Sequence, residues 1–320
     1  MTIIAKLFKH TNFVLFLLLI FSHLEIHSQT ELKNSSLDSL KFLVISDFGG
    51  QGGKVQREVG TQLGRQASIE KSCFVITCGD NYHQKGISSA TDPKWKAEFE
   101  NIYSDSALMI PWYASLGNHD YNGNPEAEIQ YSKISNRWLM PARYYSHKER
   151  INDTTNVLFI HIDTSPFITD YQKNDSIYHV SGQNTKVQLN WLDSVLANSN
   201  ARWKIVIGHH PIYSSVEKRG NTQELIEQVL PILKRHKVQV YFCGHEHFMQ
   251  YLVDGSLNSF ICGSGALTRP VGSREDVKFG SNSPGFISVT VTNDILKVYY
   301  IDDKGICLYT AVVENENEDK

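Results

Sequence analysis

Short apolar runs alternate with longer amphipathic segments along most of this chain. The runs have the length and bounding residues of buried strands, and they fall at residues 41–46, 73–78, 112–116, 157–163, 203–207, 239–243, 258–262, 286–291 and 296–301. Between many of them, apolar residues recur at helical spacing. The predicted helices are residues 55–66, 94–102, 126–138, 185–198 and 222–236. Such alternation predicts parallel pairing in much of the sheet structure.

Local signals refine this pattern and give an architecture. Pro93 suits the start of one predicted helix, and Thr185 is the expected cap of another. The runs FISVTV and LKVYYI, separated only by residues 292–295, predict an antiparallel hairpin. The loop 164–184 is long for a structureless connection and is either a substrate-side loop or a mobile one. We predict one α/β domain in which two sheets pack face to face with helices outside.

Composition excludes one class of function. The chain has 320 residues, of which 41% are hydrophobic and 20% are charged, as in an ordinary soluble globular protein. Its formal net charge is −3. The sequence therefore offers no basic surface for nucleic acid.

The N-terminus predicts export. Lys6 and Lys9 precede the apolar run 13–21, which is too short to span a bilayer and suits the core of a signal peptide. Cleavage after Ser28 would give a secreted or periplasmic protein with no stable membrane insertion, and an uncleaved anchor is the alternative. The predicted divisions are a signal peptide at 1–28, a lead-in at 29–40, the folded domain at 41–312 and a charged tail at 313–320.

The cysteines do not indicate a disulfide framework. Their number is odd, their density is low, and most lie in apolar strand-like runs, which is typical of small buried core residues. They are Cys73, Cys78, Cys243, Cys262 and Cys307.

Candidate chemistry gathers where predicted strands end. Five short segments with metal-ligand side chains each follow an apolar run: S-D-F-G-G, G-D-N-Y-H, G-N-H-D, G-H-H-P and G-H-E-H. The carboxyl ends of strands in an α/β sheet gather residues from distant parts of a chain into one site. Asp, Asn and His together suit ions such as Fe, Mn or Zn. The order of these segments predicts a dinuclear metallohydrolase.

The residues divide between two ions. Asp80 is the expected bridging carboxylate, Asp47 and His247 complete the set of one ion, and Asn118, His209 and His245 serve the other. Because alternate residues of an extended strand point to one side, His245 and His247 should both face the metals. Taken singly, Asp47 and Asp80 could be turn or cap residues, and His209 could be a core histidine.

His119, beside Asn118, is the predicted catalytic residue. A histidine projecting over the metals can protonate a leaving oxygen or stabilise charge on a phosphoryl group. The structural alternative is that His119 only positions Asp120.

At these residues the chain resembles the metallophosphoesterase superfamily, and within it the small mammalian-type tartrate-resistant purple acid phosphatases. The likeness covers roughly residues 40 to 310 in the right order, including DPKWKAEFENIYSD, PWYASLGNHDYNGN, YSKISNRWLMPARYY, VQLNWLDSVL and CGHEH. The resemblance implies a four-layer α-β-β-α sandwich of the calcineurin-like type. It also implies two metal ions per chain, Fe with Fe, Zn or Mn, and hydrolysis of small phosphate monoesters at acidic pH.

One position departs from the family at a metal ligand. The family reads G-D-N-F-Y, and its Tyr binds ferric iron and gives the purple colour. This chain reads G-D-N-Y-H, which places His83 at the Tyr position and Tyr82 at the Phe position. A His83 ligand would remove one negative charge, favour a divalent metal and abolish the colour. A shift that brings Tyr82 to the metal is the alternative, and spacing favours His83.

A second departure lies on the substrate side. The family has a histidine nine residues after the one that matches His209, and here that position is Lys218. Lys218 either binds phosphate as a point charge or is a solvated loop residue. Arg269, in the loop after ICGSG, is a second candidate for substrate contact.

The sequence therefore predicts an exported acid phosphatase that hydrolyses phosphate monoesters by attack of metal-bound hydroxide. Two rival functions fit the same residues. One is a phosphodiesterase or nucleotide pyrophosphohydrolase on the same scaffold, which activity on a diester would distinguish. The other is a catalytically silent binding or scaffold protein, which would purify without two stoichiometric metal ions.

Overall fold

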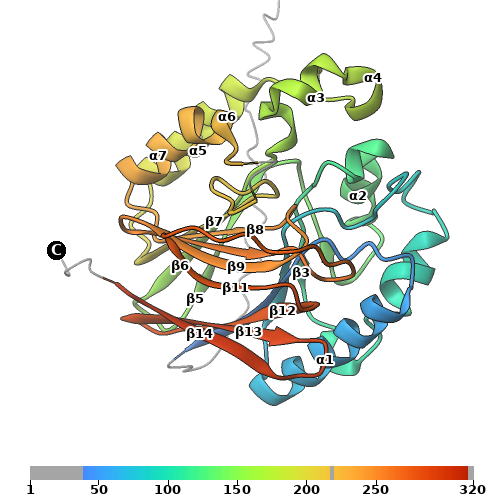
Figure 1. Ribbon diagram of the computed structural model, residues 1–320, viewed down its shortest axis with the longest axis horizontal. Coiled ribbons are helices and arrows are strands. Elements are labelled where there is room, and N and C mark those ends of the chain that lie inside the picture. The colour runs from blue at the N-terminus through green and yellow to red at the C-terminus, as the bar shows by residue number, and fades with distance from the viewer. Residues whose placement is uncertain (1–38, 217–219, 316–320) are drawn as a thin grey trace, which may run out of the picture. The chain divides into compact units, whose positions relative to one another are not determined.

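Two seven-stranded sheets lie face to face in the computed structural model, which describes residues 39–216 and 220–315 (Figure 1). The first sheet has the order β14-β13-β12-β1-β2-β3-β4 and the second the order β11-β9-β10-β8-β7-β6-β5. The first contains β1 (Leu40–Ile45), β2 (Phe74–Thr77), β3 (Trp112–Tyr113), β4 (Trp138–Leu139), β12 (Gly285–Val291), β13 (Ile295–Asp302) and β14 (Cys307–Glu314). The second contains β5 (Tyr145–Arg150), β6 (Asn156–His161), β7 (Trp203–Ile207), β8 (Val240–Cys243), β9 (Met249–Asp254), β10 (Leu257–Cys262) and β11 (Val277–Ser281).

Each sheet has a parallel centre flanked by antiparallel strands. Strands β1 to β4 pair in parallel, as do β6, β7, β8 and β10. Strands β12 and β13 form the predicted hairpin. The predictions of parallel pairing and of this hairpin are therefore confirmed, and the central strands present their carboxyl ends at one edge of each sheet.

The main core fills the space between the sheets. Phe42 of β1 is fully buried and meets Phe159 of β6 and Phe242 of β8 edge-on, at ring-centroid distances of 5.3 and 6.2 Å. It also stacks on Phe74 of β2 at 5.0 Å. The apolar runs of the sequence thus become buried strands because both of their faces are covered, one by the opposite sheet and one by helices.

Helices cover the outer faces. On the first sheet lies α1 (Lys54–Glu70), which buries Val59, Leu63 and Ala67. A second apolar cluster joins the other sheet to α5 (Thr185–Ala197), α6 (Gln223–Gln228) and α7 (Leu230–Arg235) (Figure 1). The predicted four-layer α-β-β-α arrangement in one domain is confirmed.

Some predicted boundaries are wrong for identifiable reasons. The predicted helix 222–236 is divided into α6 and α7, because Pro231 in the first turn of α7 cannot donate the hydrogen bond that a continuous helix needs. The cap of α5 is Asn184, whose side chain accepts from the N–H of Val187, and not Thr185. The predicted helix 94–102 is a short π-helix at Trp95–Glu100, and 126–138 ends early as α2 (Pro125–Tyr131).

The segment 164–184 is folded in the structure. It holds a short 3-10 helix at Ser165–Phe167, then α3 (Thr169–Lys173) and α4 (Asp175–Tyr178).

Strand β14 extends to Glu314, past the predicted domain boundary at residue 312. The predicted signal peptide and most of the charged tail lie outside the described residues. Within the described ranges, no helix is long and apolar enough to cross a membrane.

His147 on β5 predicts a loss of stability in acid. Its ring stacks on Tyr113 and Phe159, both of its nitrogens lack hydrogen-bond partners, and burial lowers its pKa to about 3. The unfolded chain, with an ordinary histidine pKa of about 6.5, binds this proton first, so stability falls as pH drops from about 6.5 towards 3. The proton uptake between pH 6.5 and pH 4 costs about 3 kcal/mol of stability. His147→Phe should therefore make the drop in Tm between pH 7 and pH 4 smaller by roughly 7–14 °C, at about 2–4 °C per kcal/mol.

Thermal melts at both pH values, followed by circular dichroism, check this expectation. His179→Gln, which replaces an exposed histidine, is the matched control and should keep the acid loss of the wild type. An equal drop in Tm for His147→Phe and the wild type would show that His147 does not cause the acid sensitivity.

Candidate metal centre

The predicted ligand residues lie in loops at the carboxyl ends of five parallel strands. Asp47 follows β1, Asp80 follows β2, Asn118 follows β3, and His209 follows β7. His245 and His247 both follow β8. Because the two sheets pack face to face, these loops from both sheets meet at one place, as the strand pattern predicts.

The backbone at this place is strained. Asp47, Asp80 and His245 all have positive φ angles, of 53°, 50° and 67°. A non-glycine residue in this region costs on the order of 1–3 kcal/mol, and such residues cluster at functional sites.

Two glycines explain why G precedes the Asn of G-N-H-D and the first His of G-H-E-H. A Cβ on Gly117 would collide with the backbone and side chain of Asp80. A Cβ on Gly244 would collide with Ser46 and with the carboxylate of Asp47. The loops can approach this closely only because these positions have no side chain.

One set of donors gathers Asp47, Asp80, His83 and His247, which we call the first donor set. One ligand atom from each lies within 4.8 Å of all the others, and all four residues are buried. His247 Nε2 lies 3.3 Å from Asp47 Oδ1, and His83 Nε2 lies 3.7 Å from Asp80 Oδ2. His83 Nδ1 is 2.9 Å from the carbonyl of Gly49, to which Nδ1–H donates, so the lone pair of Nε2 faces the set.

Unsatisfied atoms show that the first donor set fits a cation. Asp47 Oδ1 and His83 Nε2 are buried and have no hydrogen-bond partner. The other carboxylate oxygen of Asp47 accepts from Ser46 Oγ and from the N–H of His245. Burying an acceptor without a partner is costly, and a positive ion between these atoms would satisfy both.

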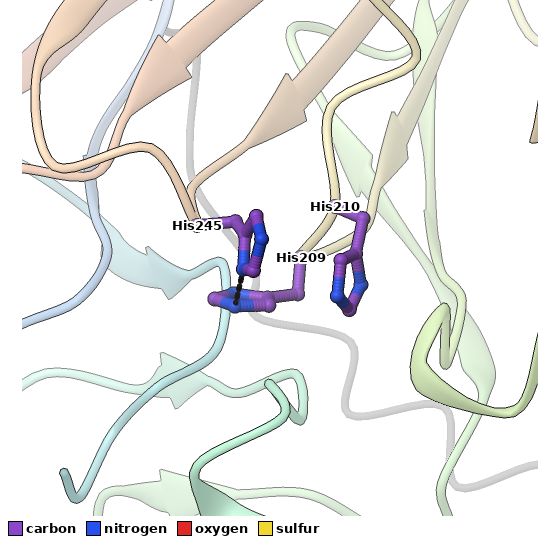
Figure 2. Close-up of side chains that lie close together, drawn as sticks. All are labelled: His209, His210 and His245. Atoms are coloured by element: carbon purple, nitrogen blue, oxygen red, sulfur yellow. Dashed lines mark hydrogen bonds between the residues drawn. The ribbon is translucent and has the colours of Figure 1, made fainter. Parts of the chain in front are cut away.

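The second donor set consists of Asp80, Asn118, His209 and His245. Asn118 Oδ1 lies 3.2 Å from His209 Nε2 and 3.0 Å from His245 Nδ1. The two nitrogens are 3.3 Å apart (Figure 2). His209 Nδ1–H donates to the carbonyl of Cys78 at 2.9 Å, which leaves the lone pair of Nε2 directed at the set. Converging oxygen and nitrogen lone pairs are the arrangement that a metal ion requires.

Asp80 lies between the two sets. Its Oδ1 is 3.4 Å from His209 Nε2, and its Oδ2 is 3.7 Å from His83 Nε2, so one oxygen faces each set. Burial alone would raise the pKa of Asp80, but His209 and His83 hold it well below its usual range. The same carboxylate raises the pKa of His209 to about 9 against the effect of burial. The centre therefore favours positive charge next to an ionised Asp80.

His210 lies beside His209 and His245 (Figure 2), and one nitrogen from each of the three rings lies within 4.8 Å of the other two. His210 Nδ1 is 2.8 Å from Thr164 Oγ1, and its Nε2 is 3.1 Å from the hydroxyl of Tyr171. With both nitrogens in hydrogen bonds, His210 has no lone pair to offer in this arrangement.

Comparison with known proteins agrees with this geometry. The family model described as calcineurin-like phosphoesterase matches residues 40–249. The chain belongs to the calcineurin-like phosphoesterase family. It is 33% identical over 292 residues to purple acid phosphatase 7 of Arabidopsis thaliana, covering 88% of each chain. It is 30% identical over 305 residues to tartrate-resistant acid phosphatase type 5 of Sus scrofa, covering 88% of this chain and 89% of the relative.

A solved structure is similar over the same length. The structure of GAP50, described as the anchor in the inner membrane complex of Plasmodium, has a TM-score of 0.77 and 25% sequence identity. The similarity covers 88% of this chain and 90% of that one. The predicted resemblance to purple acid phosphatases and the predicted fold are thus confirmed.

His83 and Tyr82, the two candidates for the position of the family's tyrosine ligand, lie in different surroundings. The ring of His83 belongs to the first donor set. The ring of Tyr82 is buried edge-on against Trp95, 5.1 Å away between ring centroids. Burial raises the pKa of the Tyr82 phenol well above its ordinary value. A tyrosine in this position is neutral and packs in the core of the phosphoesterase.

Two of the three residues predicted to face the substrate, Arg269 and His119, line one cavity. Arg269 lines the same cavity as Asp80 and His119, and its N–H donates to the carbonyl of His247 at 2.7 Å. Lys218 lies outside the described residues. His119 is half-buried at the cavity wall, with its ring 4.9 Å from that of His83 and its N–H donating to Asp80 Oδ1 at 2.8 Å. Burial lowers the pKa of His119 although Asp80 opposes the shift.

The H-E-H motif faces the centre for a different reason from the one predicted. Strand β8 ends at Cys243, and residues 245–248 form a bend instead of continuing the strand. His245 reaches the second donor set through its positive φ, while His247 reaches the first. Glu246 between them also lines the cavity. The expected alternation of an extended strand does not apply here.

Asp120 connects two loops of the centre. The sequence indicated it only as a residue that His119 would position. Its carboxylate is fully buried and accepts from the N–H groups of Gly117, at 2.8 Å, and Tyr82, at 2.9 Å. It thereby ties the loop after β2 to the loop after β3. Its neighbour Asn81 is also structural, since its amide donates to the carbonyl of Ser115 and to Glu128. The G-N-H-D motif was the available signal.

Asp120→Asn should loosen the centre without removing a ligand. Asparagine offers one acceptor oxygen, so one of the two loops loses its hydrogen bond and meets an N–H₂ group instead. We expect metal affinity to fall about 10- to 100-fold, as for other groups that orient ligands. Titration of the metal-stripped protein, read by calorimetry, measures this change. An affinity equal to that of the wild type would show that Asp120 does not hold the loops.

Proposed function

We propose that this phosphoesterase is a dinuclear-metal acid phosphatase that hydrolyses phosphate monoesters. The position of Asp80 between two converging donor sets carries the proposal, because a carboxylate with one oxygen towards each set is suited to bridge two ions. The names of the relatives in Arabidopsis thaliana and Sus scrofa support the choice of acid phosphatase.

The two donor sets support a proposed ligand assignment. Asp47, Asp80, His83 and His247 would hold one ion, and Asp80, Asn118, His209 and His245 the other. Oxygen and imidazole donors suit Fe paired with Fe, Zn or Mn. When bound, such a pair supplies charge for the phosphate oxygens and lowers the pKa of water.

The side chains of the protein would then orient substrate and move a proton. His119 lies on the cavity wall beside Asp80, where its ring can donate a proton to the leaving alkoxide. Arg269 lines the same cavity and would contact an anionic substrate. The cavity has a volume of about 550 Å³, which is enough for a small phosphorylated molecule.

Metal analysis and an activity assay on one preparation test the proposal. We expect two ions per chain and turnover of p-nitrophenyl phosphate well above that of bis-p-nitrophenyl phosphate. A higher rate on the diester would favour the phosphodiesterase alternative. Protein without metal and without turnover would contradict the proposal.

One observation favours a second candidate. GAP50, with a TM-score of 0.77 to this chain, is described as an anchor. We therefore retain a silent binding protein as the alternative function. The complete donor sets argue against it, since clustering buried polar groups is costly unless they are satisfied.

We also propose that residues 1–28 are a signal peptide and that the phosphatase is secreted or periplasmic. The charged start and the short apolar run 13–21 support this. N-terminal sequencing of the protein recovered outside the cytoplasm should begin at Gln29. Recovery of the intact N-terminus in a membrane fraction would indicate an uncleaved anchor.

The histidine at position 83 predicts a colourless enzyme. With an imidazole in place of a phenolate, an iron-loaded wild-type protein should lack a charge-transfer band. His83→Tyr should create one in the visible range, because the new phenol occupies the first donor set. Visible spectra of both proteins at equal iron content make the comparison. A band in the wild type would mean that a tyrosine already reaches the iron.

A further inference from the structure

The cavity beside the metal centre has a wall built from the segment between β6 and α5. Ile168, Tyr171, Ile177 and Tyr178 come from this segment and line the cavity together with Asp80 and His119. Ile177 is 55% exposed although it is a large apolar residue. An exposed apolar side chain that lines a polar cavity indicates a surface for an apolar part of a ligand.

Tyr171 of α3 and Tyr178 of α4 form a stacked pair. Their ring centroids are 4.0 Å apart, and their planes differ by 18°. Both rings are half-buried, and both line the cavity. The stack holds two short helices together and presents an aromatic surface next to the place where a phosphate would be held.

His210 fixes this pair to the metal centre. Thr164 Oγ1 accepts from the N–H groups of His209, at 3.3 Å, and His210, at 3.1 Å. With both lone pairs engaged, the Thr164 hydroxyl can only donate its hydrogen to His210 Nδ1, 2.8 Å away. His210 Nε2 then carries the proton and donates to the hydroxyl oxygen of Tyr171 at 3.1 Å. The aromatic pair is therefore tied through Thr164 to the backbone of His209.

We propose that Tyr171 and Tyr178 form a platform that binds the leaving group, and that it favours monoesters whose alcohol carries a planar aromatic ring. The inference rests on the proposed phosphatase function. A phosphate placed at the donor sets would direct its ester oxygen and alcohol along the cavity, where these rings lie. Stacking of an aromatic ring on this surface is expected to favour it about 2- to 10-fold over a saturated ring of the same size.

Negative charge on the same cavity wall limits which leaving groups the platform can accept. Asp170 and Glu224 place two carboxylates at the cavity, and Glu224 accepts from the N–H of Thr169 at 2.9 Å. Among the described residues of the cavity, Arg269 is the only lysine or arginine. Leaving groups with further phosphates would meet these carboxylates, so the platform suits neutral or cationic aromatic alcohols.

The test compares two substrates that differ only in the ring. Benzyl phosphate and cyclohexylmethyl phosphate both release primary alcohols of similar size, so intrinsic reactivity does not decide the outcome. The wild type should show a benzyl preference of about 2- to 10-fold in kcat/KM, expressed mainly in KM. Calorimetry with benzylphosphonic acid and cyclohexylmethylphosphonic acid, which are not hydrolysed, should give the same ratio in Kd.

Variants assign the preference to the tyrosines. Tyr178→Ala and Tyr171→Ala should bring both ratios close to one, while Tyr171→Phe keeps the stack and should retain most of the preference. Tyr309→Ala is the matched control, since it removes a half-buried tyrosine that stacks on Phe279 outside the cavity, and it should keep the wild-type ratio. Melting curves show whether each variant is folded.

The outcomes separate the platform from the phosphatase function. A wild type that hydrolyses both monoesters with a ratio of one overturns the platform and leaves the function intact. A folded Tyr178→Ala with the wild-type ratio also overturns it. A wild type that hydrolyses neither ester and binds neither phosphonate overturns the proposed function and the platform with it.

Discussion

Asp80→Ala should abolish turnover and remove metal from both donor sets. Asp80 has an oxygen towards each set, with Oδ1 at 3.4 Å from His209 Nε2 and Oδ2 at 3.7 Å from His83 Nε2. Its loss leaves six ligands but no bridge and one less negative charge between two cations. Because bound metal ions lower the activation barrier by several kcal/mol, their loss should reduce kcat/KM about 10³-fold or more.

Metal analysis of the same Asp80→Ala preparation is the necessary second measurement, since activity alone does not locate the defect. Asp153→Ala, which removes an exposed aspartate in a turn, should keep wild-type metal content and turnover. Two ions per chain in folded Asp80→Ala protein would mean that this carboxylate is not the bridge.

His119→Ala should lower kcat by about 10²- to 10⁴-fold while the protein keeps its metals. The residue lies on the cavity wall and belongs to neither donor set. A proton donor matters most for a poor leaving group, so the loss should be larger for benzyl phosphate than for p-nitrophenyl phosphate. Steady-state kinetics on both substrates, with metal content measured in parallel, check this pattern.

Equal losses on the two substrates would contradict proton donation by His119 and favour a role in binding phosphate. A loss of metal would favour the structural alternative, in which His119 positions Asp120 and the loop around it. Asn122→Ala is a useful comparison, because the amide of Asn122 approaches His119 Nδ1 at 3.4 Å and could orient the ring.

The sequence predicted the position of a metal-ligand residue correctly where a single physical rule determines that position. Buried apolar runs must become strands, and parallel strands place their carboxyl ends together, so Asp47, Asp80 and His209 could be brought to one place without coordinates. The same rule located Asn118. The choice of His83 over Tyr82 followed from spacing, and the packing of Tyr82 against Trp95 is consistent with it.

Other features depend on contacts that no local pattern encodes. Strand β5 reads YSHKER and has few apolar residues, because it lies at the edge of its sheet. The left-handed backbone at His245 appears only when Gly244 packs against Ser46 and Asp47, which lie far away in the chain. The link from His210 to Tyr171 joins two segments whose motifs gave no sign of each other.

The role of the buried Asp120 carboxylate as a hydrogen-bond acceptor was also not predicted from the sequence. Asp120 is recognisable as structural only once the N–H groups of Gly117 and Tyr82 are seen to converge on it. In the sequence it is one more acidic residue after a histidine. A carboxylate that accepts from two loops costs burial energy and holds those loops in place, which is the property that Asp120→Asn removes.

A crystal structure of the purified protein, with diffraction data collected at the metal absorption edges, would locate the metal ions directly. We expect two anomalous peaks, one among Asp47, His83 and His247 and one among Asn118, His209 and His245, with Asp80 between them. A single peak, or a first ion that is not contacted by His83, would contradict the assignment of the two donor sets.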